Sequence, residues 1–137
     1  MKNTVFRGVA TAIATPLTKD GVDYEQFARL IEMQIAAGVD AIVAVGTTGE
    51  GSTLSDEEHK EVVRYCVERT AGRVPVIAGT GSNDTAYGIE LSRYACEVGA
   101  DAMLVVTPYY NKATQNGLYT HFKTIADAST VPVILYN

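Results

Sequence analysis

The sequence predicts an α/β protein built around a parallel sheet. Short apolar runs alternate with longer segments whose apolar residues recur at helical spacing, and the connections between them are short. The chain also repeats itself weakly, because residues 37–45 resemble residues 98–106 and residues 74–77 match residues 131–134. Similar junctions that recur after about two βα units are typical of a (β/α)8 barrel. A flavodoxin-like open sheet, for which 137 residues is an ordinary length, is the alternative.

Each predicted element has a local reason. The strands are runs of small or β-branched apolar residues bounded by turn-forming residues. A Ser55-x-x-Glu58 capping box begins the second helix, while Asp23 can cap the first helix and Gly38 ends it. We therefore expect strands at residues 9–14, 41–45, 75–78, 102–106 and 133–136, and a turn at 19–21. We expect the first two helices at residues 23–37 and 56–70. The third should run from a cap at Ser82, Asn83 or Asp84 to about 97–99, and the fourth from 115 or 116 to 128.

The stretch at residues 41–52 is the best candidate for a functional site. A fully apolar strand runs into Gly46-Thr47-Thr48-Gly49, where the glycines permit a tight turn and leave two hydroxyls and two consecutive backbone N–H groups available. Such a turn at the carboxyl end of a parallel strand can form an anion-binding nest. The alternative is an ordinary strand–helix turn whose threonine hydroxyls bond the local backbone. Glu50 fits a hydrogen-bonding role within the loop better than that of a base.

Composition excludes several classes of function. The chain is 47% hydrophobic and 20% charged, which is ordinary for one globular domain. Its net charge of −5 and its lack of a basic cluster argue against nucleic acid or an acidic membrane as a partner. We recognise no signal peptide and no membrane-spanning run, and we expect Cys66 and Cys96 to be buried, reduced thiols in a cytoplasmic protein. Neither His59 nor His121 has the spacing of a metal site, so no metal is predicted.

Several separated motifs resemble one known family. They are Gly46-Thr47-Thr48-Gly49-Glu50, Thr107-Pro108-Tyr109-Tyr110-Asn111-Lys112, residues 76–83, residues 117–119 with His121-Phe122, and Ile134-Leu135-Tyr136-Asn137. From about Gly8 onward the sequence is similar to the dihydrodipicolinate synthase family, which belongs with N-acetylneuraminate lyase to the pyruvate-dependent class I aldolases. The pair Thr47-Thr48, rather than Ser-Thr, favours the synthase branch.

The resemblance implies both a fold and a reaction. It implies that residues 1–137 form a single domain, half of a (β/α)8 TIM barrel with about four βα units and a fifth strand. The family condenses pyruvate with aspartate semialdehyde in lysine biosynthesis through a Schiff base, without a cofactor. The family's Schiff-base lysine lies on the sixth strand and its semialdehyde-binding arginine just after the position of Asn137, so neither has a counterpart here.

The resemblance also assigns roles to residues. It implies that the backbone N–H groups of Thr47 and Thr48 hold the pyruvate carboxylate. It further implies that Thr47, Tyr110 and Tyr136 relay a proton, with Tyr110 entering the site of a neighbouring subunit. From the residues alone, Tyr136 could equally be a core aromatic, and Tyr109 and Tyr110 could serve packing or an interface.

A regulatory lysine site is implied as well, but in incomplete form. The family site at the dimer interface matches His59, Asn83 and Tyr109 in this chain. Asp56 and Tyr87 stand where sensitive members have a histidine and a glutamate. Because a carboxylate that pairs with the bound amino group is lost, we expect feedback inhibition by lysine to be weak or absent.

None of the lysines suits a Schiff base, which requires a desolvated amine of lowered pKa. Lys2, Lys19, Lys60, Lys112 and Lys123 all fall outside the predicted strands. We therefore expect the chain alone to bind pyruvate at most and to lack turnover. The alternatives are a self-associating structural half-barrel, as a dimer or tetramer, and a fragment of another pyruvate aldolase such as N-acetylneuraminate lyase.

Overall fold

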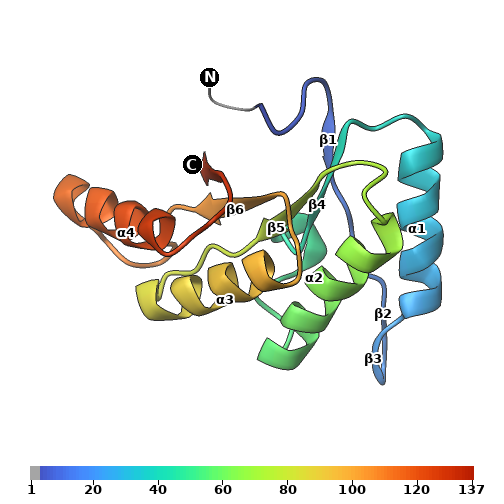
Figure 1. Ribbon diagram of the computed structural model, residues 1–137. Helices are drawn as coiled ribbons and strands as arrows, with labels where there is room; N and C mark the ends of the chain where they lie inside the picture. The colour runs from blue at the N-terminus through green and yellow to red at the C-terminus, as the bar shows by residue number, and fades with distance from the viewer. Residues whose placement is uncertain (1–3) are drawn as a thin grey trace.

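Five parallel strands form the centre of the fold, which a computed structural model describes for residues 4–137 (Figure 1). Their order in the sheet is the same as their order along the chain. This sequential order is that of a barrel wall, and it excludes the flavodoxin-like alternative, which requires a reversal of strand order. The strands are β1 (Ala10–Ala12), β4 (Ala41–Ala44), β5 (Val76–Gly79), β6 (Ala102–Val106) and β7 (Val133–Tyr136).

Four helices cover one face of the curved sheet (Figure 1). They are α1 (Tyr24–Ala36), α2 (Asp56–Thr70), α3 (Thr85–Glu97) and α4 (Gln115–Asp127). Strand alternation divides the apolar residues between two clusters. Ile42 and Ala44 point into the large core beneath the helices, whereas Ala41 and Val43 belong to a smaller cluster on the opposite, inner face. The fold is therefore half of a (β/α)8 barrel, with the helices outside.

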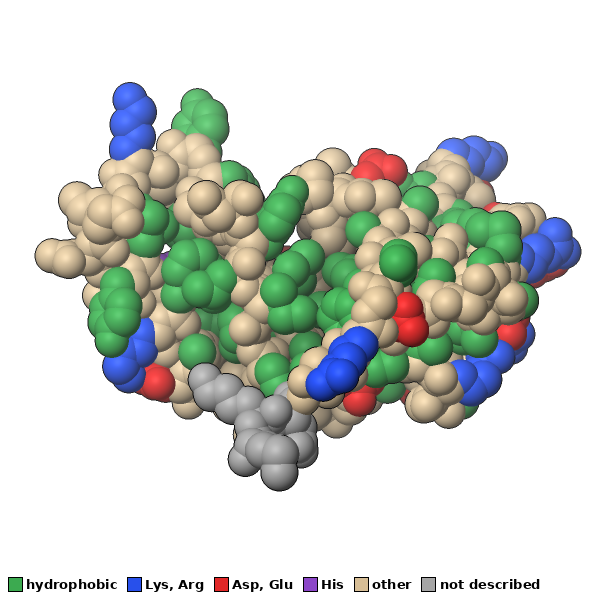
Figure 2. All heavy atoms as spheres, turned by 90° about the horizontal axis from the view of Figure 1, so that it is seen from above, with side chains coloured by type: hydrophobic (Ala, Val, Ile, Leu, Met, Phe, Trp, Pro, Cys, Tyr) green, Lys and Arg blue, Asp and Glu red, His purple; other side chains and the backbone are tan. Residues whose placement is uncertain are grey.

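The inner face carries apolar side chains across its width. Leu104 and Ile134 pack there beside the buried inner cluster, and Val5 and Phe6 from the start of the described chain pack against the same cluster. Figure 2 shows hydrophobic side chains gathered across this face of the molecule. In residues 4–137, β1 pairs only with β4 and β7 only with β6, so these two strands form the edges of the sheet.

The helix caps explain why the helices could be predicted from the sequence. Asp23 accepts a hydrogen bond from the Gln26 N–H, and Ser55 and Glu58 form a reciprocal capping box at the start of α2. Asp84 proves to be the cap of α3 among the three candidates. Thr114, which sequence analysis did not single out, caps α4.

Several expectations need correction. The first strand spans Ala10–Ala12 rather than residues 9–14, and the third spans Val76–Gly79 rather than residues 75–78. The predicted turn at residues 19–21 connects a small antiparallel hairpin, β2 (Leu17–Thr18) and β3 (Gly21–Val22), which was not predicted. Cys66 is buried, and burial raises its thiol pKa to about 12, but Cys96 is only half-buried.

Candidate functional site

The turn after β4 is held in an unusual backbone conformation. Val45 has φ 55 although it is β-branched and only 4% exposed. Such residues rarely adopt the left-handed region, and when they do the surrounding structure must impose it. Strand β4 therefore ends at Ala44, one residue earlier than predicted, and residues Thr47–Gly49 form a single 3₁₀ turn, η1.

Neighbouring backbone and one buried hydroxyl anchor this turn. The N–H groups of Gly49 and Glu50 donate to the carbonyls of Gly46 and Thr47 at 3.0 and 3.1 Å. Thr15, which follows β1, is buried and donates from Oγ1 to the Gly49 carbonyl at 2.8 Å. The N–H groups of Thr47 and Thr48 open the 3₁₀ turn, where backbone donors lack an intrahelical acceptor. The turn thus presents two consecutive donors at the carboxyl end of β4.

A cavity of about 610 Å³ opens beside the turn. Thr47 and Tyr136 both line it, together with Leu104 and Val106 from β6. The structure therefore brings one threonine and one tyrosine singled out from sequence to the same cavity. Thr48 is exposed and is not among the residues that line the cavity.

Tyr110 lies apart from the cavity. It has φ 70, and its side chain is 99% exposed. The loop that carries it is nevertheless anchored, because the Thr107 N–H donates to the Tyr136 carbonyl at 2.8 Å and Asn111 Nδ2 donates to the Asn83 carbonyl at 2.9 Å. The structure of the single chain therefore does not bring Tyr110 together with Thr47 and Tyr136.

A hydrogen bond between two helices joins two of the residues that line the same cavity. The Tyr87 hydroxyl, on α3, donates to Asp56 Oδ1, on α2, at 2.7 Å. Burial and this bond to a carboxylate raise the pKa of Tyr87. His59, Asn83 and Tyr109 line the cavity as well. All five residues that the resemblance connects with a regulatory site thus line this cavity.

The two histidines are buried in different places. His59 is 5% exposed, and its Nε2 donates to the Gly79 carbonyl at 2.8 Å. His121 is 6% exposed on α4, and its Nδ1 lies 2.8 Å from the Thr85 hydroxyl. Burial lowers the pKa of both imidazoles, although backbone contacts with Gly79 and Gly51 act in the opposite direction at His59. Burial therefore favours the neutral form of both side chains.

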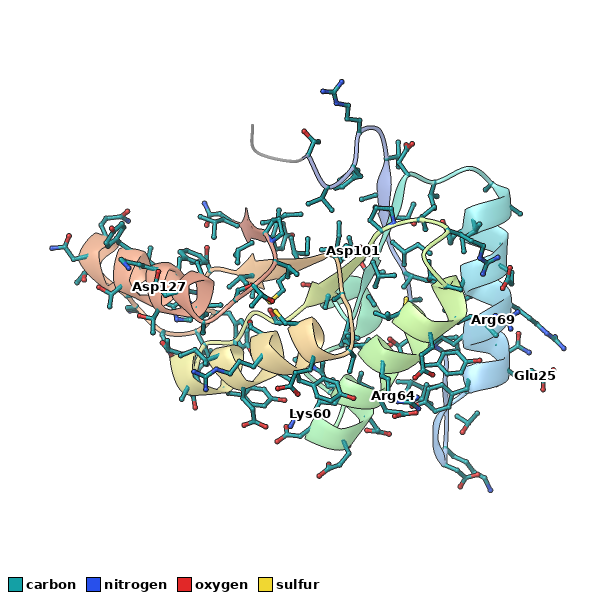
Figure 3. The ribbon with its side chains drawn as sticks, viewed as in Figure 1. Glu25, Lys60, Arg64, Arg69, Asp101 and Asp127 are labelled. Atoms are coloured by element: carbon teal, nitrogen blue, oxygen red, sulfur yellow. The ribbon has the colours of Figure 1, made fainter. Side chains whose placement is uncertain are left out.

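The described lysines do not have the environment of a Schiff-base amine. Lys60 pairs with Glu90 on the helical side of the molecule (Figure 3), and this carboxylate raises its pKa. Asp127 raises the pKa of Lys123 in the same way. Lys19 and Lys112 are exposed, and Lys2 lies outside the described residues. An amine that is charged and solvated at neutral pH cannot attack a carbonyl efficiently.

Residues 4–137 contain neither a cluster suited to a metal ion nor a helix suited to span a membrane. No group of three or more His, Cys, Asp or Glu side chains in this part of the chain is placed to hold a metal ion. None of the helices there has the length and apolar character that a membrane span requires.

Comparison with known proteins decides the family. Residues 5–137 match the Dihydrodipicolinate synthetase family. The chain belongs to that family. A 4-hydroxy-tetrahydrodipicolinate synthase from Acetivibrio thermocellus is 60% identical over 137 residues, which is 100% of this chain and 47% of the relative.

Solved structures of the dihydrodipicolinate synthetase family share the fold. A dihydrodipicolinate synthase from Aquifex aeolicus superposes with a TM-score of 0.94 at 52% identity, over 96% of this chain and 45% of that one. A chloride-inhibited enzyme from Acinetobacter baumannii, complexed with pyruvate, gives a TM-score of 0.94 at 53% identity, over 98% of this chain and 46% of that one. The chain thus spans about half the length of the relatives it matches.

Proposed function

We propose that this chain supplies the pyruvate-binding part of a 4-hydroxy-tetrahydrodipicolinate synthase, which condenses pyruvate with aspartate semialdehyde. The observation that carries this proposal is the shared cavity of Thr47 and Tyr136, at the carboxyl ends of β4 and β7. Family membership supports the substrate, because a relative at 53% identity is complexed with pyruvate. The Thr47 and Thr48 N–H groups hold the carboxylate, as backbone nests hold anions.

In this proposal, hydroxyl groups carry protons and the described chain supplies no Schiff-base amine. Thr47 and Tyr136 form the part of a relay that one chain provides, and Tyr110 completes the relay in a neighbouring copy. Its complete exposure supports a role outside its own cavity. Because no described lysine is desolvated, residues 1–137 alone bind pyruvate without covalent attachment and without turnover.

Borohydride trapping tests the chemistry directly. The chain is incubated with pyruvate and sodium borohydride, and its intact mass is measured beside that of a complete family enzyme. We expect an adduct on the complete enzyme alone. Any adduct on this chain would overturn the proposed lack of a Schiff-base amine, and its loss in Lys112→Ala would identify Lys112 as that amine. Amide shifts of Thr47 and Thr48 during a pyruvate titration test the carboxylate site separately.

Self-association is a second part of the proposal. Leu135 on edge strand β7 is 60% exposed, Val9 beside β1 is exposed, and Tyr110 projects into solvent. Unpaired edges of apolar strands template association. We expect light scattering at micromolar concentration to give at least the mass of a dimer of the 14.7 kDa chain, and Tyr110→Ala to weaken a tetramer. A monomer at every concentration would contradict this part of the proposal.

We propose also that lysine does not regulate this site. The Asp56 carboxylate is engaged by Tyr87, and a tyrosine hydroxyl is no counterion for a bound ammonium group. A calorimetric titration with lysine should show no saturable heat, and Tyr87→Glu should introduce binding. Affinity for lysine tighter than about 1 mM in the unmodified chain would contradict the proposal.

A further inference from the structure

Four residues from separate segments meet directly beneath the Thr47–Thr48 turn. A Cβ added to Gly79 would overlap the Val45 carbonyl oxygen, and one added to Gly51 would lie 2.9 Å from the same oxygen and 3.5 Å from His59 Cε1. His59 Nε2 lies 2.8 Å from the Gly79 carbonyl oxygen. The left-handed Val45, the two glycines and the imidazole therefore form one compact cluster.

His59 is the side chain that joins the parts of this cluster. It extends from α2, it donates to the last residue of β5, and it packs beside Gly51 in the loop that follows the turn. Since the carbonyl oxygen can only accept, the proton lies on Nε2. Loss of the donor would leave the buried Gly79 carbonyl with one partner fewer, and such a loss is costly for a buried polar group.

We propose that His59 is a positioning residue that holds the Thr47–Thr48 turn in the conformation in which its N–H groups face the cavity. The left-handed conformation of Val45 supports this inference, because a strained residue persists only where its surroundings impose it. That the turn binds pyruvate rests on the proposed function above. The role of His59 in the conformation of the turn does not depend on that ligand, so binding and conformation can be tested separately.

His121 provides a matched control within the same chain. It is also a buried histidine on a helix, and it also makes one side-chain hydrogen bond. Its partner is the Thr85 hydroxyl at the start of α3, rather than the backbone beneath the turn. Replacement of His121 therefore removes a buried imidazole without removing the link between α2, β5 and the turn.

The test uses three variants of His59 and one of His121 in the full chain. His59→Leu removes the hydrogen-bond donor. In His59→Asn the side chain is too short for its amide to reach the position of Nε2. In His59→Gln the longer side chain places an amide nitrogen close to that position. The first measurement is hydrogen exchange at the Gly49 and Glu50 amides, which are bonded inside the turn. The second is a pyruvate titration followed by amide chemical shifts.

We expect exchange at the two turn amides to accelerate about tenfold in the Leu and Asn variants, with a similar loss of pyruvate affinity. His59→Gln should restore both measurements to within about threefold, and His121→Leu should change neither, even where it lowers the melting temperature. If His59→Leu does not fold, His59→Asn against His59→Gln makes the same comparison.

Two outcomes would overturn the inference: unchanged turn amides in both donor-free variants, or equal loosening of the turn by His121→Leu. A failure of the unmodified chain to bind pyruvate would count against the proposed function instead. Exchange at the turn amides would still decide the role of His59 in that case.

Discussion

Val45 and Tyr110 share a left-handed backbone and differ in everything around it. Val45 has φ 55 and is buried just after β4, where the Gly79 and Gly51 backbones lie close to its carbonyl oxygen. Tyr110 has φ 70 and projects into solvent from a loop that is bonded on both sides of it. The chain itself explains the conformation of Val45. At Tyr110 the exposed side chain offers no such explanation, and we have proposed that this residue meets another copy of the chain.

The largest effect on stability is expected next to Val45, the buried residue of the two. Gly79→Ala places a methyl group against the Val45 carbonyl oxygen, so either the turn or β5 must shift. We expect a loss of about 3 kcal/mol in the free energy of unfolding, measured by urea denaturation. Gly46→Ala is the control in the same turn, since its Cβ would meet nothing closer than 3.7 Å. Equal losses in the two variants would show that Val45 is not closely confined.

Glycine at Val45 and at Tyr110 should have effects of opposite sign. Tyr110→Gly relieves about 1–2 kcal/mol of left-handed strain without loss of buried area, while the greater freedom of glycine in the unfolded chain offsets about 0.5–1 kcal/mol. We therefore expect a net gain of about 0.5–1 kcal/mol in unfolding free energy. Val45→Gly relieves similar strain but removes a buried side chain, and we expect a net loss of about 1–2 kcal/mol. Urea denaturation of both variants measures the difference. A gain at Val45 would mean that its side chain contributes little to the core.

The stability contributed by the buried histidines, one of which lies near Val45, should also depend on pH. Burial lowers the folded-state pKa of His59 and His121, so below about pH 6.5 the unfolded chain binds protons that the folded chain does not. Stability from these groups is complete above that pH and is lost as the pH falls. The slope is at most about 1.4 kcal/mol per pH unit for each histidine. Unfolding curves from pH 7.5 to 5 should show a smaller slope in His59→Gln, and an unchanged slope would contradict the assignment.

The smallest effect on stability is expected in the exposed loop that carries Tyr110. Lys112 lies in the exposed loop beside Tyr110, and Lys112→Ala should change the unfolding free energy by less than about 0.5 kcal/mol. The melting temperature measures this directly. A large loss would indicate that the loop packs against a second molecule in solution, which light scattering of the same variant would then detect.

The sequence predicted features that depend on neighbouring residues more accurately than features that depend on residues far apart in the chain. The helix beginning at Asp56 was predicted to the residue, because its cap and periodicity are local. The hairpin of β2 and β3 was missed, since two-residue strands carry no periodic signal. Thr15 was missed as well, because its bond to Gly49 joins residues 34 positions apart.

The candidate site was predictable in residue type but not in conformation. The Gly46–Gly49 motif indicated a turn, and Tyr136, also singled out from the sequence, lines the same cavity as Thr47. The left-handed Val45 could not have been predicted, because β-branched residues disfavour that conformation and only contacts with β5 and the following loop impose it. The Tyr87–Asp56 bond likewise required the packing of α2 against α3.

The sequential strand order has a consequence for how the chain acquires its structure during synthesis. Each strand of the sheet pairs with the strand that precedes it in the main sheet, so no strand waits for a distant partner that the ribosome has not yet made. Each new βα unit can add to an edge that already exists. Loop closure between successive strands then spans only about thirty residues, which favours rapid folding for a parallel sheet.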